Sequence, residues 1–186
     1  MRIVGGTHRG TILAEVGDGD RAAHLRPTSD RVREALFNML CQGRWGDLVR
    51  GQCVLDLFAG TGALGLESLS RGAEHVTLVD DGPAARALIR SNIAKLRAAG
   101  TVDHLRRDAT NLGVNQGPKA ELVFLDPPYG KNLGEKALQA ALKGGWIAPN
   151  ATIVWEENTP QNPPPECELL DQRRYGETWI TILRIF

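Results

Sequence analysis

The sequence is poor in several features that assign a protein to a special class. Its 186 residues contain only three cysteines, Cys41, Cys53 and Cys167, and none belongs to a C-x-x-C pair. We therefore expect reduced thiols, not a disulfide framework or a zinc site. No apolar run reaches about 18 residues, the length that a membrane-spanning helix needs, so we expect no membrane partner. The length suits one main domain with a sizeable core.

Net charge is also lacking, because 22 Lys and Arg residues balance 22 Asp and Glu residues. A net charge of zero argues against a generally basic nucleic-acid coat but does not exclude a local basic patch. The first fifty residues contain no lysine, and their basic side chains are Arg2, Arg9, Arg21, Arg26, Arg31, Arg33, Arg44 and Arg50. The planar arginine fork suits phosphate, so these residues indicate a basic N-terminal face or an ordinary solvated surface. The start, MRIVGGTHRG, lacks a signal-peptide pattern, and we expect a cytoplasmic protein.

From residue 51 onward, short apolar runs alternate with helical patterns, as is typical of parallel β-α-β units. Strands are predicted at 53–58, 75–80, 102–107, 120–126 and 151–157, with helices between them at about 63–71, 83–98 and 133–143. Two further strands follow the proline-rich loop at 159–167 without a helix between them, which indicates an antiparallel hairpin. The predicted fold class is α/β, with a Rossmann-like, mostly parallel sheet that ends in this hairpin.

The residues before the sheet predict an extended arm and one helix. The helix is expected to begin after the segment RPTSD, with Thr28 or Ser29 as its cap and Asp30 in its first turn. Its spacing predicts a buried stripe of Val32, Leu36, Met39 and Leu40.

The first predicted strand leads directly into DLFAGTGALGLE, residues 56–67. Gly60, Gly62 and Gly65 have the spacing G-x-G-x-x-G, which suits a tight turn that brings a nucleotide cofactor close to the start of a helix. Asp80 lies at the end of the second strand, where a carboxylate can accept hydrogen bonds from ribose hydroxyls. This pattern alone fits NAD as well as S-adenosylmethionine.

Asp56 favours S-adenosylmethionine. A carboxylate at the mouth of the loop would repel a pyrophosphate, whereas S-adenosylmethionine has no phosphate and carries an ammonium and a sulfonium. Asp108, after the third strand, is predicted either to reach the adenine amino group or to serve as a turn residue. The predicted cofactor site comprises Asp56, Phe58, Gly60, Thr61, Gly62, Asp80, Asp108 and Ala109.

The fourth predicted strand ends in DPPY, residues 126–129, which we expect beside the glycine loop. The Asp126 carboxylate and the Pro127 carbonyl can hold a conjugated amine pyramidal and aim its lone pair at a methyl group. Tyr129 can stack on the base. Transfer is then an in-line displacement assisted by positioning, in which Asp126 takes the proton late and no metal is needed. A turn that merely ends a strand is the alternative.

These motifs resemble class I S-adenosylmethionine-dependent methyltransferases of the amino-methylating type. More closely, the chain resembles the bacterial RsmD family, which methylates the N2 amine of a guanine in small-subunit (16S) ribosomal RNA. The segments that carry this resemblance are MRIVGG, LRPTSDRVREALFNML, LDLFAGTGALGLESLSRGA, LVFLDPPY and YGETWITILRI. The middle motifs are shared by many methyltransferases, whereas RPTSDRVREALFN is specific to the family.

The resemblance implies a methyltransferase domain at 51–186, with residues 1–50 as an arm and a helix packed on it. It implies that Arg26, Thr28 and Arg31 lie near the cofactor or RNA entrance and that Arg2 and Arg9 contact RNA. The implied partner is 16S rRNA in a small-subunit particle, bound by a monomer.

Three alternatives stay open. An amino-methyltransferase that acts on DNA or another RNA, at adenine N6 or cytosine N4, would share DPPY. An NAD-linked oxidoreductase would leave Asp56 and DPPY unexplained, and a non-catalytic binding module would not need Asp126 and Tyr129.

Overall fold

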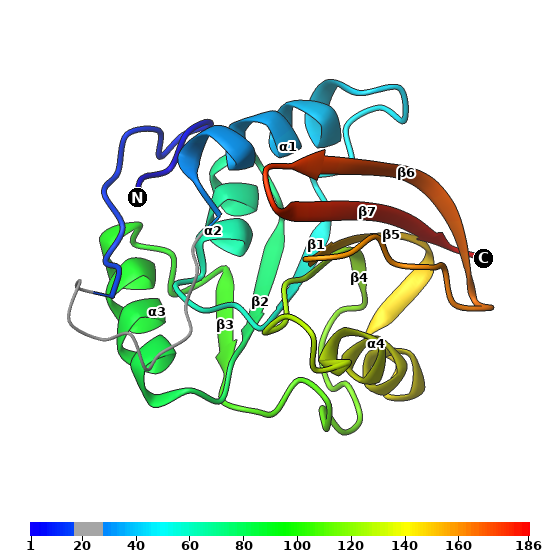
Figure 1. Ribbon diagram of the computed structural model, residues 1–186. Coiled ribbons are helices and arrows are strands. Elements are labelled where there is room, and N and C mark those ends of the chain that lie inside the picture. Colours follow the sequence, from blue (N-terminus) through cyan, green and yellow to red (C-terminus); the bar gives the residue numbers. More distant parts are fainter. Residues whose placement is uncertain (17–27) are drawn as a thin grey trace.

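The structure is a computed structural model that describes residues 1–16 and 28–186. Figure 1 shows its helices and strands, which are α1 (Asp30–Gln42), β1 (Cys53–Leu57), α2 (Ala63–Ser70), β2 (His75–Val79), α3 (Pro83–Lys95), β3 (Val102–Leu105), β4 (Ala120–Leu125), α4 (Leu133–Lys143), β5 (Ile147–Glu157), β6 (Cys167–Tyr175) and β7 (Thr178–Ile185). The predicted bounds agree within two residues except at two ends. The third helix ends at Lys95 because Arg97 adopts a left-handed φ of 52°, and β5 begins at Ile147, which pairs with Ala120 ahead of a register shift.

The strands form one sheet in the order β3-β2-β1-β4-β5-β7-β6. The pairs among β1 to β5 are parallel, whereas β7 runs antiparallel to both β5 and β6. The predicted α/β class, with its mostly parallel sheet and C-terminal hairpin, is therefore confirmed. Since β1 lies between β2 and β4, the strand order reverses at β1, and a ligand crevice is expected beyond the carboxyl ends of β1 and β4.

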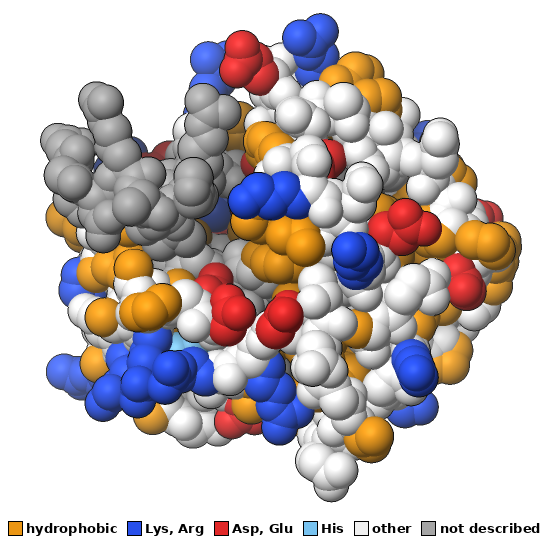
Figure 2. Space-filling view, turned by 60° about the horizontal axis from the view of Figure 1, so that its bottom comes forward, with side chains coloured by type: hydrophobic (Ala, Val, Ile, Leu, Met, Phe, Trp, Pro, Cys, Tyr) orange, Lys and Arg blue, Asp and Glu red, His pale blue; other side chains and the backbone are white. Residues whose placement is uncertain are grey.

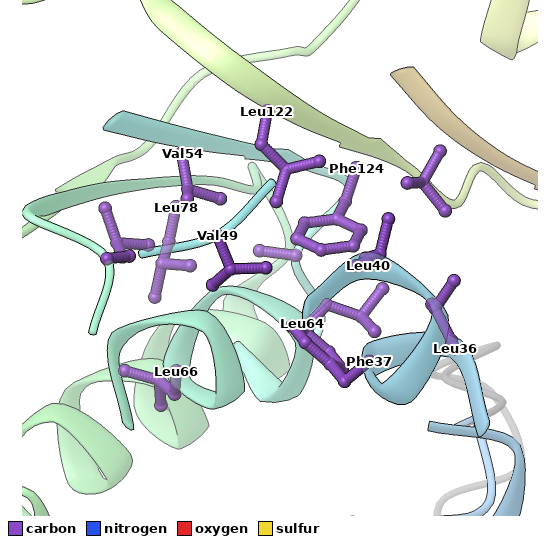
Figure 3. Close-up of a cluster of buried hydrophobic side chains, with 14 of the residues drawn as sticks. Leu36, Phe37, Leu40, Val49, Val54, Leu64, Leu66, Leu78, Leu122 and Phe124 are labelled. Atoms are coloured by element: carbon purple, nitrogen blue, oxygen red, sulfur yellow. The ribbon is translucent and has the colours of Figure 1, made fainter. Parts of the chain in front are cut away.

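Helices cover both faces of the sheet. One buried cluster joins α1, α2 and α3 to the sheet and includes Leu122 and Phe124 of β4, and a second joins α4 to the opposite face and includes Val123 and Leu125. Figure 3 shows the first cluster, in which the rings of Phe37 and Phe124 lie 5.7 Å apart between centroids. Because successive residues of a strand point to opposite faces, a strand buried on both faces is a continuous apolar run.

The N-terminal arm packs on the same face as α2 and α3. Ile3 and Leu13 lie fully within the first buried cluster. Asn92 of α3, which is fully buried, accepts a hydrogen bond from the Ala14 N–H at 2.6 Å and donates to the carbonyls of Ala14 and Thr61 at 3.1 and 2.9 Å. The arm is thus tied directly to the glycine loop through one amide side chain.

The predicted stripe of the first helix is partly wrong. Leu36, Met39 and Leu40 are buried as expected, but Val32 is only partly buried. Arg33 is completely buried in its place, because Asp30 and Glu67 lie close enough to neutralise its guanidinium.

The cysteines are all free, with Cys167 buried and the other two partly buried, as the expected reduced thiols require. Within residues 1–16 and 28–186, no group of three or more His, Cys, Asp or Glu side chains could hold a metal ion. In the same ranges, no helix is long and apolar enough to cross a membrane.

Candidate active site

A cavity of about 470 Å³ lies at the carboxyl ends of β1 and β4, where the strand order reverses. Its lining comes from the glycine loop, from residues 80–82 after β2, from the DPPY turn and from Thr28 and Arg33 at the start of α1. Figure 2 shows a hollow on this face in which hydrophobic side chains meet acidic side chains. Its size is typical of small-molecule sites.

The glycine loop is shaped by conformation and by close packing. Gly62, just before α2, has a φ of 80°. Residues other than glycine rarely adopt a φ in this range. At Gly65 a Cβ atom would lie 2.4 Å from a Leu78 side-chain carbon, so only glycine lets α2 approach β2 this closely. Phe58, which is not glycine, also has a positive φ of 62°, a strained conformation that is typical of ligand sites.

Asp80 ties the glycine loop to the end of β2. Its two carboxylate oxygens accept hydrogen bonds from the backbone N–H groups of Gly60, at 2.9 Å, and Gly82, at 2.8 Å. Burial raises the pKa of Asp80, although these two hydrogen bonds oppose the rise. Each oxygen keeps a second lone pair, so the carboxylate can still accept a ligand hydroxyl.

Asp56 lies in the floor of the cavity, deeper than the predicted mouth of the loop. The side chain is 1% exposed and accepts a hydrogen bond from the Gly65 N–H at 2.9 Å. Burial raises the pKa of Asp56 to about 7, and nearby Asp80 adds to the rise. A bound cation would favour the charged form and a pyrophosphate would oppose it, so this floor fits the ammonium and sulfonium of S-adenosylmethionine.

The DPPY turn is anchored beside the glycine loop, since the Asp126 N–H reaches the carbonyl of Leu57 at 3.5 Å. In the described part of the chain, the Asp126 carboxylate accepts no hydrogen bond. Burial raises the pKa of Asp126 well above its usual range, and the negative charges of Glu156, Asp56 and Glu157 raise it further. Asp126 is therefore a carboxyl group whose hydrogen-bonding capacity is left for a ligand.

Glu156, at the end of β5, holds two segments of the site together. One of its oxygens accepts a hydrogen bond from the Tyr129 hydroxyl at 2.9 Å, and the other accepts one from the Thr28 hydroxyl at 2.9 Å. Its side chain is 6% exposed, and burial raises its pKa against the effect of both hydrogen bonds. The neighbouring Glu157 accepts a hydrogen bond from the Gly130 N–H at 3.3 Å.

Sequence reasoning missed Glu156, Glu157 and Arg33 as site residues. A signal for the two glutamates was present, because they end a strand beside the one that ends in Asp126. The sequence holds no comparable signal for Arg33.

Most of the predicted cofactor residues line the cavity, namely Asp56, Phe58, Gly60, Thr61 and Asp80. Gly62, Asp108 and Ala109 are not among the residues that line it. Asp108 is exposed, and its carboxylate accepts hydrogen bonds from the N–H and hydroxyl of Thr110 at 2.8 and 2.7 Å, as a turn residue does. Its role toward adenine stays a prediction.

Among the described residues, the arginines predicted to bind RNA do not line this cavity. Arg2, Arg9 and Arg31 are exposed, and Arg2 lies 3.6 Å from the carboxylate of Asp30. Arg26 lies outside the described residues. Their contact with RNA stays a prediction.

Several known proteins that this chain resembles are named as methyltransferases. The family model described as "Conserved hypothetical protein 95" matches residues 1–184. The chain is 39% identical over 164 residues to ribosomal RNA small subunit methyltransferase D of Escherichia coli K12, covering 88% of this chain and 78% of the relative. It is 34% identical over 182 residues to the protein of the same name from Haemophilus influenzae, covering 95% and 89%.

Structural comparison gives the same result. The solved structure of the Escherichia coli protein yhhF superimposes with a TM-score of 0.82 at 33% identity, covering all of this chain and 97% of that one. The resemblance seen in the motifs is thus confirmed along nearly the whole chain. The chain belongs to the conserved hypothetical protein 95 family, which is the RsmD family of S-adenosylmethionine-dependent methyltransferases.

Proposed function

We propose that this protein transfers the methyl group of S-adenosylmethionine to the exocyclic N2 amine of a guanine in 16S ribosomal RNA. The observation that carries the proposal is Asp126, an acceptor without a donor among the described residues, in the same cavity as the glycine loop. Relatives named ribosomal RNA small subunit methyltransferase D support the class of substrate. The proposal includes a monomer that acts in the cytoplasm on a small-subunit particle.

The chemistry of the amine accounts for the DPPY residues. The lone pair of an exocyclic amine is delocalised into its ring, so the amine is a poor nucleophile until it is made pyramidal. Hydrogen bonds from its two hydrogens to the Asp126 carboxylate and the Pro127 carbonyl hold it in that form. Pro127 and Pro128 lack backbone N–H groups and stiffen the turn, which leaves carbonyls to face the amine. The Tyr129 ring stacks on the base.

The acids of the cavity serve both substrates. When bound, S-adenosylmethionine supplies an electrophilic methyl group on a cationic sulfur. Asp56 and Asp80 bind and orient that cationic ligand, and its charge favours the ionised form of both. Asp126 accepts a hydrogen bond from the amine, and it must be ionised to take the amine proton late in the transfer.

The test is methyl transfer from labelled S-adenosylmethionine to small-subunit RNA or particles from a strain that lacks this protein, followed by nucleoside analysis. We expect label in N2-methylguanosine. Label in N6-methyladenine or N4-methylcytosine, or only in added DNA, would support the alternative amino-methyltransferase instead.

A pair of variants tests the role of Asp126. Asp126→Ala should nearly abolish turnover while S-adenosylmethionine still binds. The matched control is Asp103→Ala, which removes an exposed carboxylate of β3 that faces His75 instead of the cavity, and it should keep turnover. Unchanged turnover in Asp126→Ala would defeat the assignment.

A further inference from the structure

Three arginines, two on α3 and one just after β3, lie close to His104. Arg86 and Arg90 are one helical turn apart on α3, so they share one face of that helix. Arg106 directly follows β3, the edge strand on which α3 packs. All three are exposed, and the charges of all three act on the ring of His104 in β3. We call Arg86, Arg90 and Arg106 the arginine patch.

The patch borders the cavity through the backbone of α3. Asp80, Asp81 and Gly82 line the cavity, and α3 begins at the next residue. The Arg86 N–H donates to the carbonyl of Gly82 at 3.0 Å, so Arg86 lies one turn from the cavity lining. Figure 2 shows Lys and Arg side chains gathered around a histidine, next to acidic side chains on this face.

The positive charge of the patch is not neutralised by ion pairs within the described residues. Several other arginines do form ion pairs, such as Arg2 with Asp30 and Arg173 with Asp171. None of the patch arginines forms a salt bridge in those same residues. The histidine near them does not add charge at neutral pH, because burial lowers the pKa of His104 and the arginines lower it further, although the charge of Asp80 opposes this shift.

We propose that Arg86, Arg90 and Arg106 dock the phosphate backbone of the RNA substrate at the rim of the methyl-transfer cavity. This inference rests on the proposed function. Guanidinium groups bind phosphate oxygens through two parallel N–H donors, and backbone contacts of this kind position a nucleic acid without reading its sequence. The patch, in addition to any contact from the N-terminal arm, then holds the RNA strand beside the target nucleotide.

The test is the triple variant Arg86→Gln, Arg90→Gln, Arg106→Gln in the full chain. Binding to small-subunit RNA is measured over a series of salt concentrations, along with KM and kcat for methylation. We expect the slope of log affinity against log salt to fall in magnitude by about two, since each phosphate contact accounts for about 0.7 to 0.9. KM for RNA should rise, and affinity for S-adenosylmethionine should stay unchanged. The corresponding triple Lys variant, which keeps the charges, should restore most of the slope.

The matched control removes three arginines from other parts of the surface, as Arg50→Gln, Arg173→Gln, Arg174→Gln. Arg173 and Arg174 belong to β6, at the opposite edge of the sheet from β3, and all three are exposed. The control should keep the salt slope. An equal loss in both triple variants would mean that only net charge matters and would overturn the patch.

The remaining outcomes separate the two proposals. Wild-type protein that transfers no label to ribosomal RNA overturns the proposed function, and the docking surface falls with it. Wild-type methylation together with an unchanged salt slope in the patch variant overturns the docking surface alone. Loss of affinity for assembled particles but not for naked RNA would also overturn it, in favour of an acidic protein surface as the occupant.

Discussion

The buried carboxylate of Glu156 connects the DPPY turn to the start of α1, so a change at this residue affects both parts of the active site. It accepts one hydrogen bond from Tyr129 of the DPPY turn and one from Thr28, just before α1, both at 2.9 Å. Glu156→Gln keeps the shape of the side chain but removes its charge and turns one acceptor into a donor. Both hydroxyls then lose a charged partner, and one of them must reorient.

The size of the effect follows from these two contacts. A hydrogen bond to a charged group contributes about 1.5 to 3 kcal/mol, and one between neutral groups about 0.5 to 1.5 kcal/mol. Losing about 1 kcal/mol at each of two contacts weakens the positioning of Tyr129 and Thr28 by about 2 kcal/mol. Since about 1.4 kcal/mol is a tenfold change in rate, we expect kcat/KM of Glu156→Gln to fall about 10- to 30-fold. Glu156→Ala should lose more, because both hydroxyls are left without an acceptor.

The pH dependence distinguishes positioning from a merely structural role. Asp126 faces Glu156 and Glu157 at the end of β5 and Asp56 in β1, and after burial the charge of Glu156 is the next cause of its raised pKa. Besides Asp56 and Asp126, the charged groups that line the cavity are Arg33, Asp80, Asp81 and Lys131. Activity needs ionised Asp126, so it rises with pH through the pKa of that group. Removing the negative charge of Glu156 lowers this pKa, and the acidic limb of the profile should move to lower pH.

The assay is kcat/KM for RNA methylation across pH for wild type, Glu156→Gln and the control Glu168→Gln. Glu168 is an exposed residue of β6, so its variant should reproduce the wild-type profile. An acidic limb of Glu156→Gln that stays in place or moves to higher pH would refute the electrostatic link to Asp126. A loss of activity that tracks only a loss of folded protein would refute the positioning role.

Three further predictions follow from single side chains. Tyr129→Phe loses one hydrogen bond to a charged acceptor and should keep kcat within about tenfold of wild type, whereas Tyr129→Ala should lose much more; equal losses would assign the role to the hydroxyl. Asn92→Ala leaves backbone groups of Ala14 and Thr61 without partners and should lower the free energy of unfolding by about 2 to 4 kcal/mol in denaturant titration, whereas a loss below about 0.5 kcal/mol would mean that water replaces the side chain. Because Asp56 has a folded-state pKa of about 7, above its unfolded value, its contribution to stability is complete below about pH 4 and is lost as pH rises through 7; Asp56→Asn should flatten that decline, and an unchanged decline would contradict the raised pKa.

Local patterns were sufficient to predict the fold. Each central strand is buried on both faces, so its apolar run is visible in the sequence without knowledge of its neighbours. The glycine loop and the DPPY turn are also local, and they lie at strand ends that the parallel order brings together. The part of the site that was missed is the part made by distant residues. The hydroxyls of Thr28 and Tyr129 both donate to the carboxylate of Glu156, although the three residues belong to different segments of the chain.

Charge is where prediction from the sequence failed most clearly. A helix pattern assigns charged residues to the solvated face, yet Arg33 is completely buried. One of its acidic partners, Asp30, lies on the same helix, but the other, Glu67, comes from α2 and is not predictable from the helix pattern. The arginine patch was missed for a related reason. Its members are dispersed in the sequence, and only the packing of α3 on the edge strand joins Arg106 to the two arginines of the helix.

The buried Glu67 explains why the segments that mark this family occur together. It ends the glycine-loop motif, and its carboxylate accepts hydrogen bonds from the N–H groups of Val4 and Gly5 in the first motif, at 2.9 and 2.8 Å. It also lies 3.5 Å from the guanidinium of Arg33 in the RPTSDRVRE segment and accepts from Arg71 at 2.8 Å. A buried carboxylate needs such donors, and a buried arginine needs such an acid. One charged group, Glu67, therefore contacts the arm, the first helix and the cofactor-loop helix at once, so the loss of Arg33 or of Glu67 would leave a buried charge without its partner.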